Sequence, residues 1–63
     1  MNKILLVEDD HLLNKTLTYN LSLDGYELTS VFNARDAAAA IRRQRFDVAL
    51  LDINLPDGNG YEL

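Results

Sequence analysis

Carboxylates follow two apolar segments of this chain, and their positions define the chemistry that the sequence could support. Glu8 and Asp9 follow Ile4–Val7, and Asp52 follows Val48–Leu51. If the two segments are parallel strands of one sheet, their carboxyl ends share an edge and these acids lie together. Their negative charges repel unless a cation lies among them. Oxygen ligands suit a hard divalent ion such as Mg²⁺, and a carboxylate beside that ion can act as a nucleophile toward phosphorus.

Length and composition limit the classes of protein to which the chain can belong. The 63 residues include no cysteine, so they allow one small domain or part of a larger one, without disulfides. A chain of this size buries only about 60% of the surface that its unfolded form exposes, so its core is marginal. Six Lys and Arg against ten Asp and Glu give a formal charge of −4. This balance argues against a nucleic-acid-binding surface and favours a cation as partner.

The first residues do not resemble a targeting segment. Only four apolar residues stand between Lys3 and Glu8, which is too few for a signal peptide. No apolar run approaches the roughly 20 residues that a membrane-spanning helix needs. We therefore expect a cytoplasmic protein that makes no membrane contact.

The pattern around the acids predicts alternating strands and helices. After the strand Ile4–Val7, helical spacing begins at His11, and Gly25 is expected to end that helix as a left-handed residue rather than to form a hairpin. The apolar positions that define the helix are Leu12, Leu13, Leu17, Leu21 and Leu23. Tyr26–Val31 is more polar and predicts a strand at a sheet edge.

A second helix is predicted before the strand Val48–Leu51. Asn33 resembles an N-cap with Asp36 as its acidic partner, and the run Ala37–Ala40 favours a helix that packs closely on the sheet. Arg42, Arg43 and Arg45 are expected in its last turn, as a solvated helix end. The order strand, helix, strand, helix, strand predicts an α/β fold with parallel strands and right-handed crossovers.

Two motifs resemble a known family. Lys3–Asp10 and Asp47–Gly60 are similar to the receiver domain of two-component response regulators, and the resemblance covers residues 1–63. It implies a flavodoxin-like (CheY-like) fold with strand order 2-1-3-4-5. In this chain the fold would be truncated to two strand-helix units, the third strand and the phosphoacceptor loop. Glu8–Asp9 and the turn Leu55–Gly58 look most like the transcriptional regulators that carry a winged-helix DNA-binding domain.

The resemblance also implies roles for individual residues. Asp52 would be the phosphoacceptor, charged by a partner histidine kinase, so the chain would accept phosphate in a phosphorelay rather than act as an enzyme. Asp9 would bind Mg²⁺ directly, and Glu8 would act mostly through water. The backbone carbonyl of Asn54 would complete the metal site. Pro56 and Gly60 would shape the loop, after which Tyr61–Leu63 looks like the start of another helix.

A complete receiver has five strand-helix units, so part of its machinery would lie beyond Leu63. That part includes a hydroxyl residue and a lysine at the ends of the fourth and fifth strands. Without the lysine, an arriving phosphoryl group lacks a fixed positive contact, and we expect an impaired switch. Val48–Leu51 would be an open apolar edge, which predicts a two-fold dimer with antiparallel third strands. The alternative function is a self-assembling structural unit without phosphotransfer activity.

Other interpretations of the same residues fit less well. In a calcium loop starting at Asp52, Asn54 fits, but Pro56, Asp57 and Leu63 replace the fifth ligand, the required Gly and the bidentate Glu. A dehalogenase-type phosphatase would want a second Asp where Asn54 stands.

Two residues beside the acids have simpler explanations. Asp10 is expected to stabilise the start of the first helix. His11 is expected to be an exposed helix residue rather than a metal ligand or catalytic group.

Overall fold

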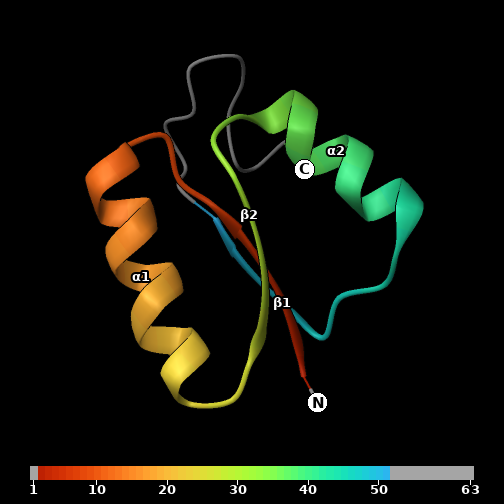
Figure 1. Ribbon diagram of the computed structural model, residues 1–63. Helices are drawn as coiled ribbons and strands as arrows, with labels where there is room; N and C mark the ends of the chain where they lie inside the picture. Colours follow the sequence, from red (N-terminus) through yellow and green to blue (C-terminus); the bar gives the residue numbers. More distant parts are fainter. Residues whose placement is uncertain (1, 52–63) are drawn as a thin grey trace.

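The computed structural model describes residues 2–51, which form a three-stranded parallel sheet between two helices (Figure 1). The elements are β1 (Lys3–Val7), α1 (His11–Leu23), β2 (Glu27–Val31), α2 (Ala34–Arg43) and β3 (Val48–Leu51). This order confirms the predicted alternation of strands and helices. The predictions for Asp52 and Asn54, for the loop with Pro56 and Gly60, and for a helix starting at Tyr61–Leu63 fall outside the described residues.

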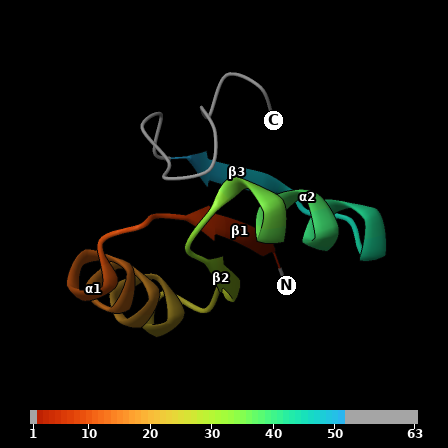
Figure 2. The same cartoon turned by 90° about the horizontal axis from the view of Figure 1, so that it is seen from above.

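β1 is the central strand of the sheet. The strand order is β2-β1-β3, and β1 pairs in parallel with both neighbours. α1 and α2 lie on opposite faces of the sheet, as expected where each crossover returns the chain to a parallel strand (Figure 2). The order matches the first three strands of the predicted flavodoxin-like arrangement. The edge position predicted for the second strand is also confirmed.

The amino end of β1 is hydrogen bonded on both sides. On one side, the backbone N–H of Lys3 donates to the Oδ2 atom of Asp47 at 2.7 Å, and the backbone N–H of Asp47 donates to the Lys3 carbonyl at 2.8 Å. On the other side, the N–H of Glu27 donates to the carbonyl of Asn2 at 2.9 Å. These bonds fix both outer strands against the start of the central strand.

The core is built on β1, whose side chains alternate between the two faces of the sheet. Leu5 and Val7 form a buried cluster with Ala37 and Ala40 of α2. Ile4 and Leu6 are buried too, and by alternation they face the α1 side. Because alanine has a short side chain, α2 can approach the sheet closely, which confirms the packing predicted for the alanine run. Each buried Val, Leu or Ile side chain contributes about 1.5–3 kcal/mol, and each alanine less.

The residue that α1 buries is polar, which the sequence interpretation did not predict. Asn14 is only 2% exposed, whereas Leu12 is 77% exposed and lies outside the core. Leu13 and Leu23 are exposed as well, so the five leucines do not form one buried face. Asn14 lies three and seven residues before Leu17 and Leu21, the two leucines that are partly buried. The face of α1 that meets the sheet therefore runs through the asparagine.

Gly25 ends α1 in the predicted way. Its φ angle is +90°, a value that other residues rarely adopt. Its N–H donates to the Ser22 carbonyl at 3.1 Å, and the N–H of Tyr26 donates to the Leu21 carbonyl at 3.4 Å. These two bonds make a Schellman motif, which satisfies carbonyls that the helix leaves without partners. The chain then enters β2, which is parallel to β1 and not a hairpin partner of what precedes it.

α2 begins as predicted but ends earlier. The side chain of Asn33 accepts a hydrogen bond from the N–H of Asp36 at 2.8 Å, so Asn33 is the N-cap. At the other end Gln44 has an extended backbone, with φ −153° and ψ 165°. The helix therefore stops before Arg45, and the prediction that all three arginines share its last turn was wrong for this one.

β3 is apolar but exposed. All four of its residues are exposed, including Val48 at 47% and Leu51 at 41%. Within residues 2–51, β3 pairs only with β1, so it forms an edge of the sheet. Among the described residues, β3 is therefore not covered on both faces, unlike β1, and its exposed edge agrees with the predicted open strand. None of the helices described here is long and apolar enough to cross a bilayer.

Candidate functional site

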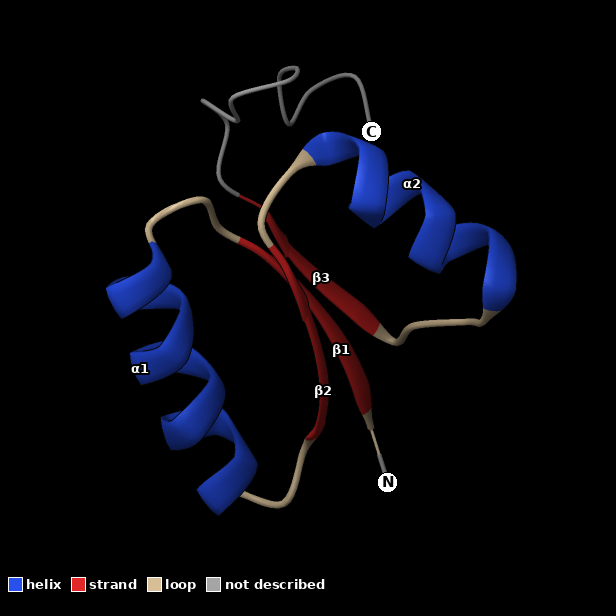
Figure 3. Cartoon of the chain, turned by 45° about the horizontal axis from the view of Figure 1, so that its top comes forward, coloured by secondary structure: helices blue, strands red, loops and turns tan. Residues whose placement is uncertain are grey.

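The candidate site lies where β1 and β3 end side by side (Figure 3). The two strands are parallel and in register, with Val7 opposite Leu51 at their carboxyl ends. Glu8 follows the first of these residues and Asp52 follows the second. The described residues therefore bring the chain to the expected edge from both strands, although Asp52 itself lies outside them.

Glu8, Asp9 and Asp10 have different surroundings. The Oδ1 atom of Asp10 accepts a hydrogen bond from the N–H of Leu13 at 3.1 Å, which makes Asp10 the N-cap of α1. This confirms the prediction that Asp10 stabilises the start of the helix. Glu8 is half-buried, and its Oε2 atom accepts a hydrogen bond from the N–H of Asp10 at 3.1 Å. Asp9 is exposed to solvent just beyond the carboxyl end of β1.

Asn14 is the residue near this site that the sequence interpretation missed. Its Nδ2 atom donates to the carbonyl oxygens of Glu8 and Val31, each at 3.1 Å. Its Oδ1 atom accepts from the hydroxyl of Thr18 at 3.4 Å. One buried amide therefore connects α1 to the ends of both β1 and β2.

An aromatic contact joins the start of α1 to the loop that follows β2. The rings of His11 and Phe32 stack with centroids 4.3 Å apart and an angle of 21° between their planes. His11 is exposed, as predicted, but its ring contact was not predicted. His11 is the first residue of α1, and Phe32 lies in the loop that follows β2. The start of α1 is therefore in contact with this loop.

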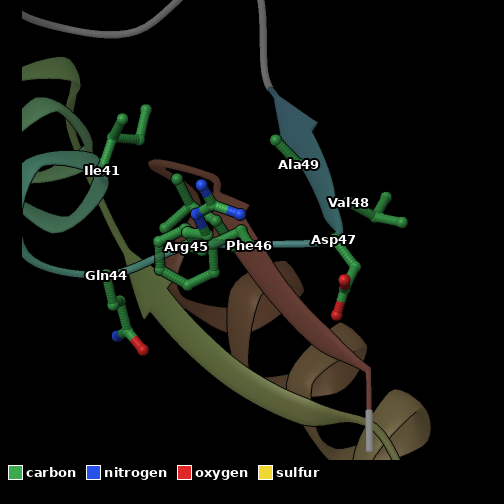
Figure 4. Close-up of a pocket in the computed structure, with 8 residues that line it drawn as sticks. Ile41, Gln44, Arg45, Phe46, Asp47, Val48 and Ala49 are labelled. Carbon is green, nitrogen blue, oxygen red and sulfur yellow. The ribbon is translucent and has the colours of Figure 1, made fainter.

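A groove of about 460 Å³ lies elsewhere, at the start of β3 (Figure 4). Its lining residues are Leu5, Ile41, Gln44, Arg45, Phe46, Asp47, Val48 and Ala49. Asp47 is the one carboxylate among them, and it accepts the hydrogen bond from Lys3 described above. The groove lies toward the amino end of the strand, away from Glu8 and Asp9. It is therefore not part of the candidate acidic site.

The carboxylate oxygens that follow β1 suit a hard divalent cation. Glu8 and Asp9 are adjacent and supply oxygen ligands, which Mg²⁺ prefers. Within residues 2–51, no group of three His, Cys, Asp or Glu side chains could hold a metal ion. The predicted ligand set takes its other members, Asp52 and the Asn54 carbonyl, from outside that range.

The fold and this edge define a class: an α/β protein with a parallel sheet and acidic residues where the first strand ends. The sequence model of one protein family, the response regulator receiver domain, matches residues 4–63 of this chain. The chain belongs to this family of two-component signalling proteins. The resemblance seen in the sequence motifs is thereby confirmed, and so is the receiver-type fold.

Individual relatives agree with this family. The transcriptional regulatory protein KdpE of Staphylococcus aureus is 44% identical over 59 residues, which are 94% of this chain and 26% of KdpE. The non-phosphorylated receiver domain of HemR from Leptospira biflexa superposes with a TM-score of 0.93 at 40% identity, covering 98% of this chain and 50% of that one.

A third relative has been solved with ligands. The response regulator TrrA of Thermotoga maritima, in complex with Mg²⁺ and BeF, matches with a TM-score of 0.92 at 31% identity, over 98% of this chain and 54% of that one. TrrA has also been solved in complex with the histidine kinase ThkA. The chain thus spans about half the length of these receivers and about a quarter of KdpE.

Proposed function

We propose that this chain is a phosphorelay receiver in which Asp52 accepts a phosphoryl group from a sensor histidine kinase in the presence of Mg²⁺. The observation that carries the proposal is the register of β1 and β3, with Val7 opposite Leu51. Because the strands are parallel, the residues that follow them leave the sheet at one edge. Glu8 and Asp9 follow one strand and Asp52 follows the other.

In the proposed reaction, a carboxylate oxygen of Asp52 attacks the phosphorus of a phosphohistidine. The new O–P bond forms as the N–P bond breaks, and the imidazole leaves with the electron pair and takes up a proton. Mg²⁺ would neutralise the charge that gathers on the phosphoryl oxygens. Glu8, Asp9, Asp52 and the backbone carbonyl of Asn54 would hold the ion, with Glu8 acting mostly through water.

Two comparisons support these finer assignments. TrrA has been solved with Mg²⁺ and BeF, and it has been solved with its histidine kinase. An ion and a kinase are therefore the partners that we propose for this receiver. The role is that of a phosphate acceptor, which receives the group rather than turning over a substrate of its own.

The test is the intact mass of the protein after treatment with acetyl phosphate and Mg²⁺. We expect the parent to gain one phosphoryl group and Asp52→Asn to gain none. Asp24→Asn is a matched control, because it makes the same change of charge at the far end of α1, where Asp24 is the C-cap. Loss of the modification in Asp24→Asn, or its persistence in Asp52→Asn, would contradict the assignment of Asp52.

A second function is favoured by the exposure of β3. Val48, Leu50 and Leu51 are between 38% and 47% exposed on a strand that forms an edge of the described sheet. We propose that two such edges pair antiparallel about a two-fold axis, which gives a six-stranded sheet. Light scattering after size exclusion is expected to show a dimer, and β3 substitutions such as Leu50→Lys are expected to give a monomer. A folded monomer at high concentration would exclude this assembly.

A further inference from the structure

The buried amide of Asn14 bonds to the backbone that carries Glu8 and Asp9. We infer that Asn14 is a positioning residue for the proposed Mg²⁺ site, acting through the Glu8–Asp9 peptide. The inference rests on the function proposed above, and it adds a residue that touches neither the ion nor the phosphoryl group.

The Asn14 amide completes a small hydrogen-bond network at the carboxyl ends of β1 and β2. Asn14 is 2% exposed, and its Nδ2 atom lies 3.1 Å from the carbonyl oxygens of both Glu8 and Val31. The Val31 carbonyl also accepts from the backbone N–H of Glu8 at 3.1 Å. Glu8 is therefore held at both its N–H and its carbonyl, although it lies beyond the last residue of β1.

The network requires an asparagine in particular. Two carbonyl oxygens need two donors at one point, and an amide NH₂ supplies both from a short side chain. The hydroxyl of Thr18 donates to Oδ1, which fixes the orientation of the amide with its nitrogen toward the carbonyls. Leucine has the same branched arrangement of side-chain heavy atoms but no donor, and serine has one donor. A carboxylate would place oxygen against two carbonyl oxygens.

The Glu8 carbonyl belongs to the peptide plane that joins Glu8 to Asp9. This plane includes both Cα atoms, so a displacement of the plane moves the points from which the two carboxylates extend. Mg²⁺ demands nearly ideal octahedral geometry with short metal–oxygen distances. A binding site of this kind tolerates displacements of only about 0.5 Å before its ligands lose their geometry. The amide is thus suited to hold the two acids where one ion can use them.

The test compares Mg²⁺ affinity with stability. Asn14→Leu removes both donors, and Ala40→Gly weakens the fold from the buried side of α2, on the other face of the sheet. The Mg²⁺ dissociation constant is measured on the folded protein by NMR titration of backbone amides, and the melting temperature is measured without Mg²⁺. We expect Asn14→Leu to raise the dissociation constant about tenfold, in the range known for outer-shell partners of metal ligands. Ala40→Gly is expected to lower the melting temperature and to bind Mg²⁺ as the parent does.

The outcomes separate the inference from the proposed function. If the parent binds Mg²⁺ and Asn14→Leu binds it equally well, the positioning role is overturned while the proposed site stands. If Asn14→Leu does not fold, Asn14→Ser decides, because it keeps one donor and is expected to weaken binding by less than tenfold. Equal affinity of Asn14→Ser and the parent would then overturn the inference. If the parent binds no Mg²⁺, the proposed function fails and the positioning role fails with it.

Discussion

Asp9 and Asp10 are neighbours in the sequence, and we predict that their substitution has different effects. Asp10→Ala removes the acceptor for the N–H of Leu13, so the free energy of unfolding should fall by about 1 kcal/mol. This is about a fivefold change in the ratio of folded to unfolded protein. For a domain of this size it lowers the melting temperature by about 4–8 °C. Asp10→Ser restores an N-cap acceptor and should recover most of that loss.

The Mg²⁺ affinity should depend on Asp9 more than on Asp10. Asp10→Ser removes one exposed charge, which is worth at most about 1 kcal/mol, or roughly fivefold in affinity. Asp9→Asn removes a proposed direct ligand, and it should weaken binding at least about tenfold, since outer-shell partners alone cost that much. Urea denaturation without Mg²⁺ followed by circular dichroism gives the stability. A Mg²⁺ titration of the same preparations gives the affinity.

Two results would refute this reasoning. If Asp10→Ser is as unstable as Asp10→Ala, the side chain of Asp10 does not act as a cap. If Asp10→Ser loses Mg²⁺ binding to the same extent as Asp9→Asn, the division of roles between the two acids is wrong.

Three further predictions concern stability and are checked by urea denaturation. Leu5→Ala should lower the free energy of unfolding by about 2–5 kcal/mol because Leu5 is fully buried, whereas Leu12→Ala, at a position 77% exposed, should change it by less than about 0.5 kcal/mol. Equal effects would contradict the assigned core. Gly25→Ala should lower the free energy of unfolding by about 1–2 kcal/mol because of backbone strain at φ +90°. A steric clash adds nothing to this cost, because a Cβ at this position meets no atom within 4 Å. An unchanged unfolding midpoint would show that the strain is absent. Asn33→Ala should cost about 1 kcal/mol and Asn33→Asp much less, and the reverse order would rule out the capping role.

The sequence was sufficient for most of the fold because its local signals agree with one another. The apolar run of β1 predicts a buried central strand, and Leu5 and Val7 are indeed fully buried. Gly25 and Asn33 are residues whose conformational preferences determine where a helix ends or begins. The end of α2 was misplaced, because the extended backbone of Gln44 precedes Arg45 and helix propensity does not reveal it.

The part that could not be predicted depends on contacts between distant residues. Helical spacing identified the leucines of α1 and assigned no role to Asn14. It is buried because the Glu8 and Val31 carbonyls, at the ends of two different strands, need donors. That need appears only when the strands are side by side. For the site itself, Glu8 and Asp9 follow β1 at the predicted end of the sheet. The roles of Glu8, Asp9, Asp52 and Asn54 all remain predictions.

The bonds at the beginning of the chain have a practical consequence for anyone who alters it. Asn2 is hydrogen bonded to Glu27, and Lys3 is hydrogen bonded to Asp47. These first residues therefore connect the central strand to both outer strands. Deleting Asn2 would take an acceptor from one neighbour, and a proline at Lys3 would take a donor from the other. An affinity tag fused to the amino terminus therefore needs a flexible spacer that leaves these hydrogen bonds intact.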